Sequence, residues 1–478
     1  MPLFKKPIEQ EFFSLRLRAG RPMTELEFYA RELTDWETSP ERREMIDGDR
    51  YYTGDHDILK RQRTAIGPDG KLIVIENLPN NRIVDNQYAK HVDQKANYLL
   101  GQPISFSCEN DDYAAEVKKV LGMRFMRTLK SAGVECLNAG ISWLYPYYNK
   151  NGELAFRVFP GYEIMPFWAD AAHTELDSAL RLYPVEVYYG TEKKIVKKVD
   201  LFTLEGVTTY IFENGVLTPD TEKQAYVKVK DSKGNEQPLN WERFPLIPIK
   251  YNPKEVPLIR RGRSLQDAIN LLQSDFVNNM EEDVRNTVLV LKNYDGQDLG
   301  EFRRNLTTYG AIKVRTVEGT DGGVDSLEIS VNSENYKTVL ELLKKALIEN
   351  LRSYDAKDDR LSGTPNQMNI QSMYCDIDLD ANAMETELQA SFEEILWFVN
   401  TYLANTGKGS YEGEDITVIF NRDILINESE AIDNCSKSVG IISDETIVAM
   451  HPWVDDPAAE LERLEKQKEE TDPYRAAF

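Results

Sequence analysis

The chain has 478 residues, 41% of them hydrophobic and 10% aromatic, a composition that can form the cores of about three domains. Its formal net charge of −23 excludes a protein that holds nucleic acid tightly by its phosphates, because such binding needs clustered Lys and Arg. It does not exclude a passing contact, since an acidic surface repels the DNA backbone and lets it slide. The chain has no run of eighteen apolar residues and its N-terminus, MPLFKKPIEQEFF, lacks the pattern of a signal peptide, so we expect a cytosolic protein without a membrane span.

The first half of the chain changes from a helical to an extended pattern. To about Leu121 the pattern is largely helical, and one helix, whose apolar face includes Ile83 and Leu99, ends at Gly101. Another helix is predicted over 125–137. Ile141–Tyr251 then consists of short alternating runs separated by Gly, Asn and Pro, which predicts antiparallel strands with a first hairpin turning at Asn-Lys-Asn-Gly, residues 149–152.

Helical spacing returns at Gly262, where Ser264 and Asp267 match a capping box at a helix start. The predicted apolar stripe of this helix is Leu265, Ile269, Leu272, Phe276 and Met280. A short strand–helix–strand insert follows, and Ser333–Tyr354 is helical again. Long striped helices around a small insert indicate a protein that packs against copies of itself, because one subunit would leave them uncovered.

The next segment, Asp358–Ser372 (DDRLSGTPNQMNIQS), is polar and too long for a tight turn. Loops of this kind are usually functional or a sign of misassigned elements. A third helix, over Met373–Leu403, has apolar residues at steps of three and four and would be roughly 45 Å long. Between Leu361 and Gly407 the chain has no Lys or Arg, and this one-signed charge suggests a function. The carboxylates of this helix are Asp376, Asp378, Asp380, Glu385, Glu387, Glu393 and Glu394.

The common catalytic and phosphate-binding motifs are absent, and the four cysteines are too far apart in the sequence to suggest a zinc site, so we predict no cofactor and no enzyme. A calcium-loop pattern is matched by Asp376, Asp378, Asp380 and Glu387. However, Ala381 stands where the sharp turn of such a loop needs Gly, and helical spacing continues through it, so these four are weak metal candidates. A metal-dependent nuclease or phosphodiesterase using the three aspartates is the alternative interpretation, although nothing else supplies a second catalytic group.

Four stretches, in their order and spacing, resemble the portal proteins of tailed double-stranded DNA bacteriophages, particularly those of long-tailed phages of Gram-positive hosts. They are NYLLGQPISF, GRSLQDAINLLQSDFVNNMEEDVRNTVLVLKN, FNRDILINESEA and GIISDETIVAMHPWVDDPAAELERLE. The resemblance extends over nearly the whole chain. It implies an α+β fold, with an elongated multidomain subunit in a homo-oligomeric ring, usually a dodecamer, around a DNA channel.

The resemblance also divides the chain into the parts of a portal subunit. These are a wing (1–261, N-terminal helices and antiparallel β region), a stem helix (262–286), a clip (287–332), a second stem helix (333–354), a tunnel loop (355–372), a spine helix (373–405), a wing strand (406–426) and a crown (427–478).

In this family the tunnel loop projects into the channel and touches DNA without sequence specificity. The residues expected to do so here are Lys357, Asp358, Asp359, Arg360, Ser362, Thr364, Asn366 and Gln367. Gly363 and Pro365 interrupt the helix, and a spine without cations would leave the channel wall unable to hold DNA. An ordinary surface loop is the alternative.

By the same resemblance the clip faces the terminase packaging motor and later the head-to-tail adaptor. Its basic residues, expected to dock these partners, are Arg303, Arg304, Lys313 and Arg315. Ordinary surface charge is the alternative there. The other implied partners are the scaffold and the major capsid protein. The implied location is the capsid vertex of the virion, after assembly in the cytoplasm of the bacterial host, and a minor capsid protein without a channel is a further alternative.

Overall fold

The computed structural model describes residues 23–66, 70–74, 78–230, 236–283, 288–292, 323–327, 333–355, 367–422, 428–454 and 457–471. It consists of helices and antiparallel sheets, so the predicted α+β class is confirmed. The chain divides into two compact units. The first comprises 1–53, 88–262 and 348–478, and the second comprises 54–87 and 263–347.

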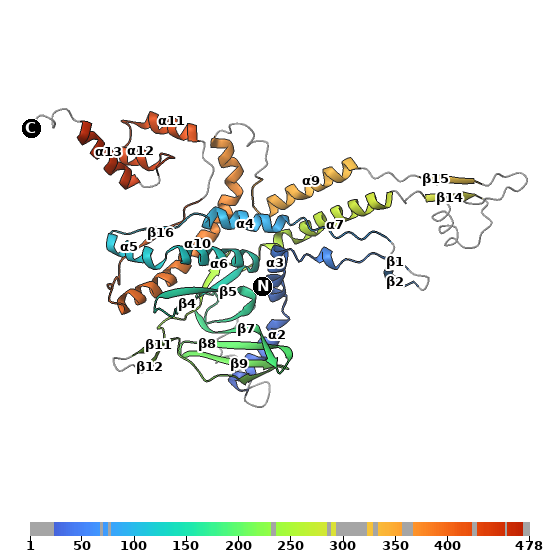
Figure 1. Cartoon of the computed structure of the whole chain (residues 1–478), viewed down its shortest axis with the longest axis horizontal. Coiled ribbons are helices and arrows are strands. Elements are labelled where there is room, and N and C mark those ends of the chain that lie inside the picture. Colours follow the sequence, from blue (N-terminus) through green and yellow to red (C-terminus); the bar gives the residue numbers. More distant parts are fainter. Residues whose placement is uncertain are drawn as a thin grey trace, which may run out of the picture. The chain divides into compact units, whose positions relative to one another are not determined.

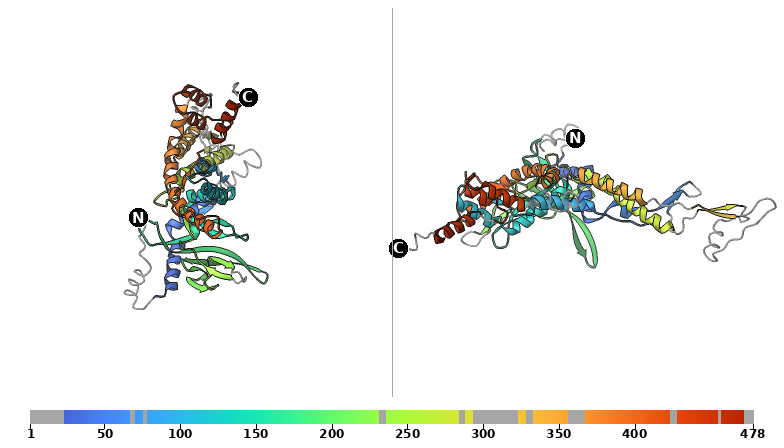
Figure 2. Two further views of the ribbon diagram at one scale, coloured as in Figure 1. Left: turned by 90° about the vertical axis from the view of Figure 1, so that its left-hand side faces the viewer. Right: turned by 90° about the horizontal axis from the view of Figure 1, so that it is seen from above.

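In the first unit a helix covers a five-stranded sheet (Figure 1). The helix α2 (Glu25–Glu37) begins at a capping box, in which Thr24 Oγ1 accepts from the Glu27 N–H at 3.2 Å. Its apolar face packs on the sheet through Phe28, Tyr29 and Leu33, and α3 (Pro40–Thr53) follows. The strands, in the order β10-β9-β8-β7-β6, are β6 (Ile164–Trp168), β7 (Leu176–Tyr189), β8 (Glu192–Thr203), β9 (Gly206–Glu213) and β10 (Val216–Pro219). Because β7 and β8 are longer than their neighbours, their hairpin extends past the sheet (Figure 2).

A three-stranded sheet forms the second layer of this unit. Its order is β13-β4-β5, with β4 (Ile141–Tyr148), β5 (Leu154–Pro160) and β13 (Ile247–Lys250). The β4–β5 hairpin turns at residues 149–152, as predicted, and Trp143 at its centre is fully buried. Around this sheet lie α4 (Gln87–Leu100), β3 (Ser105–Ser107), α5 (Asp111–Val120), α6 (Met123–Ala139), the short helix η2 (Gly161–Glu163), β11 (Val227–Lys230), β12 (Glu236–Leu239) and β16 (Thr417–Ile419).

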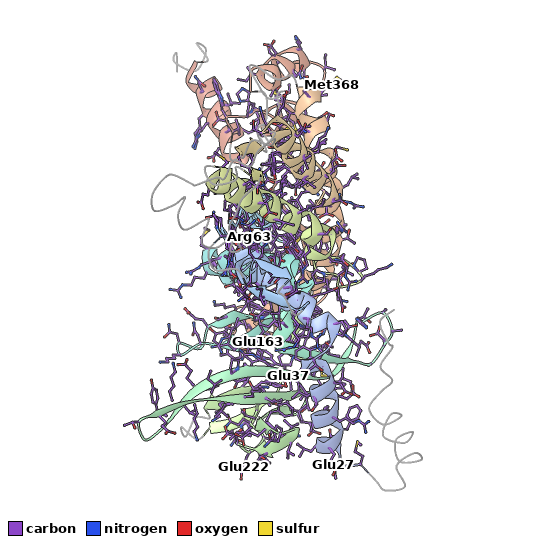
Figure 3. The ribbon with its side chains drawn as sticks, turned by 90° about the vertical axis from the view of Figure 1, so that its right-hand side faces the viewer. Glu27, Glu37, Arg63, Glu163, Glu222 and Met368 are labelled. Carbon is purple, nitrogen blue, oxygen red and sulfur yellow. The ribbon has the colours of Figure 1, made fainter. Side chains whose placement is uncertain are left out.

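The helix α10 (Gln367–Asn405) is 39 residues long and forms much of the core of the first unit. Its buried apolar residues include Ile377, Met384, Leu388, Phe392, Ile395 and Val399. The helix begins at Gln367, earlier than the predicted start at Met373, so Gln367 belongs to the helix and not to the loop. Met368 is 77% exposed at this end (Figure 3). The chain continues through α11 (Glu428–Ser438), α12 (Asp444–Ala449) and α13 (Pro457–Thr471).

The second unit contains most of two long helices and an N-terminal segment. The helices are α7 (Ile259–Asp283) and α9 (Ser333–Asn350), whose outer turns belong to the first unit. The remaining elements are η1 (Asp57–Lys60), β1 (Thr64–Ile66), β2 (Leu72–Val74), β14 (Val288–Lys292) and β15 (Gly323–Leu327). Two expectations were wrong here. Because α7 already starts at Ile259, Ser264 and Asp267 lie inside the helix and form no capping box at its start, and Ile83 precedes α4 in extended backbone.

The buried face of α7 is largely polar, although Ile269 of the predicted apolar stripe is also fully buried. Every fourth residue, namely Gln266, Asn270, Ser274 and Asn278, is fully buried, whereas Met280 of the predicted stripe is 56% exposed. These side chains bind the backbone of 81–85: Asn278 Oδ1 accepts from the Asn81 N–H at 2.7 Å, Ser274 Oγ from Ile83 at 2.9 Å and Asn270 Oδ1 from Asp85 at 3.0 Å. The spacing fits because four helical residues and two extended ones both advance about 6–7 Å. Residues 81–85 are therefore attached to α7 by a row of hydrogen bonds.

Candidate functional site

Tyr354, just before segment 356–366, and Tyr374, in α10 after it, belong to one cluster of side chains in the first unit. The predicted loop residues Lys357, Asp358, Asp359, Arg360, Ser362, Thr364 and Asn366 lie outside the described residues. The chain is described up to Asp355 and again from Gln367, and both of these ends can be followed into the cluster.

The chain leaves α9 through a Schellman turn. The Ser353 N–H donates to the Ile348 carbonyl at 3.0 Å, and the Arg352 N–H donates to that of Glu349 at 3.1 Å. Arg352 has a φ of 50° at the position where such turns normally have Gly. The turn is stabilised from α4, because Lys95 Nζ donates to the Arg352 carbonyl at 3.0 Å. Gln94 Nε2 donates to the Tyr354 carbonyl at 3.3 Å.

Three tyrosines join the entrance of the segment to its exit. The ring of Tyr354, before the segment, lies 4.6 Å from that of Tyr374, after it. Tyr374 in turn stacks on Tyr98 of α4, with 5.7 Å between centroids and an interplanar angle of 21°. The Tyr98 hydroxyl donates to Asp378 Oδ1 at 2.8 Å. Residues 355 and 367 are thus the ends of a segment whose base is fixed by aromatic contacts.

Asp380 is the ionic centre of this base, and it is only 4% exposed. Its Oδ2 accepts from Lys95 Nζ and from the Tyr251 hydroxyl, both at 2.7 Å. Its Oδ1 lies 3.2 Å from Arg261 and 3.8 Å from Arg352. Burial by itself would raise the pKa of Asp380, but the charge and hydrogen bonds of Lys95, with Tyr251 and Arg261, outweigh it and hold the pKa below its ordinary value. Asp380 is therefore a carboxylate of α10 that links α4, the turn after α9, Tyr251 and the first turn of α7.

A second cation neutralises the next part of α10. Arg422, just after β16, binds Asp378 and also Glu385, the latter at 2.6 Å. Further along, Arg243 binds Glu394 at 2.9 Å. The carboxylates of α10 thus receive cations from other segments of the chain. The expectation that the spine helix presents one-signed charge is therefore wrong for Asp378, Asp380, Glu385 and Glu394.

The four weak metal candidates do not lie in a metal-binding loop, and two of them form ion pairs. Asp376, Asp378, Asp380 and Glu387 all lie on continuous helix, not in a calcium-binding loop. Asp378 and Asp380 are bound to Arg422 and Lys95, which leaves them poor ligands for a metal ion. Within the described ranges, no group of three or more His, Cys, Asp or Glu residues has the geometry to hold a metal ion. The predicted clip residues, Arg303, Arg304, Lys313 and Arg315, lie outside those ranges.

The match to a known family extends over almost the entire chain. A family model described as phage portal protein, SPP1 Gp6-like, matches residues 37–474. The chain belongs to this family of portal proteins. It is 30% identical over 427 residues to the portal protein of Bacillus phage SPP1, covering 88% of this chain and 83% of that protein. It is 27% identical over 440 residues to the portal protein of Clostridium phage phiCD119, covering 89% of this chain and 93% of that protein. No helix in the described part of this portal chain is long and apolar enough to cross a bilayer.

The residues at the base of the segment were not recognised from the sequence of this portal chain. Lys95 had one usable signal, because it falls at helical spacing with Val92 and Leu99 on the apolar face of α4. A cation at such a position needs a buried partner. Arg261 and Arg422 had no comparable signal, since their carboxylate partners are at least 37 residues away in the sequence.

Proposed function

We propose that this portal protein forms a closed ring at the capsid vertex, through which double-stranded DNA is packaged and later ejected, and that segment 356–366 faces the channel. The observation that carries the assignment of the segment is its clamped base: Tyr354 and Tyr374 are in contact, and Asp380 binds Lys95 and Arg352 below them. A segment on such a base can meet a moving ligand without loosening the fold, which is the usual arrangement for functional loops on rigid scaffolds.

The composition of the segment suits transient contact with DNA. Its sequence, AKDDRLSGTPN, contains the two cations Lys357 and Arg360 and the two carboxylates Asp358 and Asp359. A segment of zero net charge gains little from releasing counterions, so any contact of Lys357 or Arg360 with phosphate would be brief. DNA would then pass without being trapped and without its sequence being read. The polar Ser362, Thr364 and Asn366 can face water or phosphate equally well.

The further parts of the proposal rest on family membership. The ring has twelve subunits in the usual portal arrangement, and the clip with Arg303, Arg304, Lys313 and Arg315 docks the terminase motor and then the head-to-tail adaptor. The ring is built in the host cytoplasm with scaffold and major capsid protein, and it ends as a component of the virion. A closed ring is the arrangement in which head-to-tail contacts between identical subunits are all satisfied.

The function is structural and not enzymatic. A metal-dependent nuclease would need free carboxylates around its ion, whereas Asp378 and Asp380 are engaged by Arg422 and Lys95. A test with magnesium and manganese should find no DNA cleavage above that of a mock preparation. Cleavage that disappears in Asp378→Ala would establish the enzymatic alternative instead.

Shortening the loop tests the channel assignment. Removal of Ser362 to Asn366 leaves every contact of the clamped base in place, so rings and melting temperature should be unchanged while DNA packaging falls. A control is Thr191→Ser in the β7–β8 turn, a conservative change at an exposed position of the same unit. Loss of rings in the shortened variant, or normal packaging by it, would contradict the assignment.

A further inference from the structure

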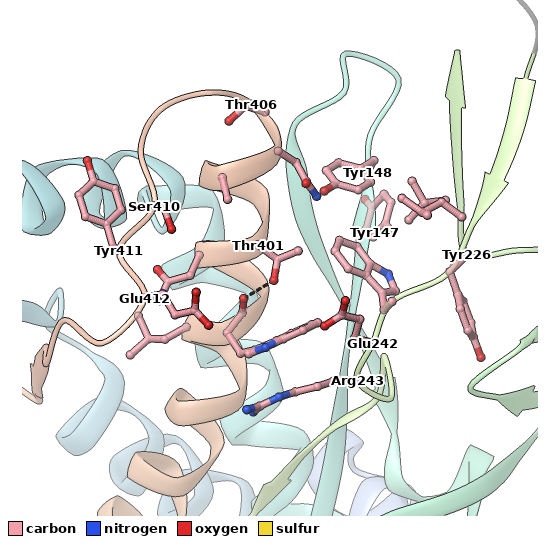
Figure 4. A pocket seen from close by; sticks show the side chains of 18 of the residues that line it. Tyr147, Tyr148, Tyr226, Glu242, Arg243, Thr401, Thr406, Ser410, Tyr411 and Glu412 are labelled. Carbon is pink, nitrogen blue, oxygen red and sulfur yellow. Dashed lines mark hydrogen bonds between the residues drawn. The ribbon is translucent and has the colours of Figure 1, made fainter. Parts of the chain in front are cut away.

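A large groove lies in the first unit beside the C-terminal half of α10 (Figure 4). Its volume is about 1710 Å³, and its walls come from α10, the end of the β4–β5 hairpin, the segment after β12 and residues 410–416. The lining contains seven large aromatic residues: Tyr113, Tyr147, Tyr148, Tyr226, Trp241, Trp397 and Tyr411. None of the contacts described above for the clamped base involves this groove.

The aromatic walls of the groove are fixed in place. Trp241 stacks on Tyr148, with 5.3 Å between ring centroids, and meets the edge of Phe398 at 5.1 Å. Tyr411 stacks on Tyr113 at 4.6 Å. A preformed apolar surface of this kind binds aromatic or aliphatic side chains at a low entropic cost.

The groove is also acidic. Its lining includes five carboxylates, Glu242, Glu393, Glu412, Glu414 and Asp415, against three cations, Lys150, Lys228 and Arg243. Arg243 is already paired with Glu394 at 2.9 Å and lies over the Trp397 ring at 5.1 Å. Glu242 and Glu412 make no ion pair within the described part of this unit, and both are visible in the groove in Figure 4. The complementary ligand is therefore a basic chain that carries aromatic side chains.

This combination occurs in the chain's own first 22 residues, although the protein as a whole has a net charge of −23. The sequence MPLFKKPIEQEFFSLRLRAGRP has five cations and two carboxylates, and it contains Phe4, Phe12 and Phe13. The next residue, Met23, packs against the core of the unit that carries the groove. A chain of this length can extend about 70 Å, and its attachment to the same unit gives it a high effective concentration there.

We propose that the groove binds residues 1–22 of the same chain, with the cations of the segment against Glu242 and Glu412 and its phenylalanines against Trp397 and Tyr411. The proposal goes beyond the ring and channel functions, because it assigns a binding role to a surface and a segment that neither function uses. The groove then holds the N-terminal segment on the subunit, and acidic residues gather there because the segment is basic.

Photo-crosslinking of the full-length protein tests this. A photoreactive phenylalanine analogue in place of Phe12 should cross-link to peptides that contain Trp397 or Tyr411, identified by mass spectrometry. The double variant Glu242→Lys with Glu412→Lys should lower that yield about ten-fold, the combined effect of reversing two partly exposed charges. Glu242→Gln with Glu412→Gln should give an intermediate yield, and Glu192→Lys, an exposed carboxylate on β8, should change nothing.

Each result of this experiment decides the question. Melting temperatures show whether the variants are folded, and ring formation is recorded separately. An unchanged yield in the folded lysine variant, or cross-links that fall mainly outside the groove, would overturn the proposal. Mixing isotopically light and heavy copies before assembly distinguishes cross-links within one chain from cross-links between subunits. Cross-links that join light to heavy chains would assign the groove to a neighbouring subunit's segment and overturn its assignment to the same chain.

Discussion

Lys95 and Asp380 form a buried ion pair, with 2.7 Å between Nζ and Oδ2, and they join α4 to α10. Neither side chain is more than 6% exposed. Buried pairs of this kind add little stability over an apolar pair, but loss of one partner leaves the other charge buried and uncompensated. The pair is therefore the place where a single substitution should release the base of the segment.

Asp380→Asn is expected to lower the free energy of unfolding by about 3–5 kcal/mol, because the positive charges of Lys95, Arg261 and Arg352 lose their common carboxylate. Urea denaturation followed by tryptophan fluorescence measures this. Asp376→Asn is the matched control, since Asp376 is exposed on the same helix and should change stability by less than about 0.5 kcal/mol. Equal effects of the two substitutions would show that Asp380 is not the ionic centre of the base.

Glu135 predicts a dependence of stability on pH. It lies on α6, its Oε2 is buried without a hydrogen-bond partner in the described structure, and burial, followed by the charges of Asp49 and Glu163, raises its pKa from 4.5 to about 7. The folded chain therefore keeps a proton that the unfolded chain loses, so stability from this group falls as pH rises from about 4.5 to 7. Glu135→Gln removes this loss.

The difference in unfolding free energy between Glu135→Gln and wild type should accordingly grow by about 2–3 kcal/mol in favour of the variant from pH 4 to pH 8. Denaturant titrations at both pH values measure the difference, which cancels the other titrating groups. Glu192→Gln, at an exposed position, should show no such trend. A flat difference for Glu135→Gln would mean that the carboxyl group is ionised without penalty.

The polar face of α7 predicts an unusual sensitivity to small substitutions. Ser274→Ala should lower stability by about 1–3 kcal/mol, because the partly buried N–H of Ile83 loses its acceptor at 2.9 Å. Ser264→Ala, at an exposed position of the same helix, should change it by less than about 0.5 kcal/mol. Hydrogen exchange of the Ile83 amide gives a local measurement, and protection retained in Ser274→Ala would contradict the role of this hydroxyl.

Local sequence signals predicted some elements of the fold, but not the buried polar face of α7. The β4–β5 turn and the long α10 were predictable, because Asn-Lys-Asn-Gly and apolar spacings of three and four are local signals. The buried Gln266 and Asn270 resemble solvent-exposed residues by any local pattern. They are buried because residues distant in sequence, His56 and 81–85, contact them. The capping box at Ser264 failed for a related reason, since the packing of Ile259 starts the helix earlier than its own propensity would.

The contacts around Asp380 at the clamped base could not be predicted from sequence for the same reason. A window over α10 contains its carboxylates but not Lys95, Arg261 or Arg422, which come from elsewhere in the chain. The sequence of α10 alone suggested an acidic surface. In the structure, cations from other segments pair with Asp378, Asp380, Glu385 and Glu394 of this helix. The proposed passage of DNA then depends on the zero net charge of segment 356–366 and not on repulsion by α10.

Charge reversal in the clip tests partner docking. Arg303→Glu with Arg304→Glu should leave rings intact and weaken binding of the packaging motor or adaptor, because a basic patch speeds encounter with an acidic partner. Association rates at two salt concentrations measure this, and the wild-type rate should fall with salt more steeply than that of the variant. Arg463→Glu on the exposed helix α13 is a control for charge reversal elsewhere. Unchanged association would assign the cluster to ordinary surface charge.

Lys357 and Arg360 provide the most direct test of the channel segment, because they are its two cations. If they touch passing phosphates, replacing both by Ala should alter the rate of DNA translocation or the retention of packaged DNA, and the effect should shrink as salt rises. The contacts described for Tyr354, Tyr374 and Asp380 are made by other residues, so rings and melting temperature should match wild type. Single-molecule packaging at two salt concentrations measures the rate, with Asp358→Asn and Asp359→Asn as the matched opposite change, which should lengthen the contacts with DNA. A Lys357→Ala, Arg360→Ala ring that packages and retains DNA like wild type at both salt concentrations would remove these cations from the channel.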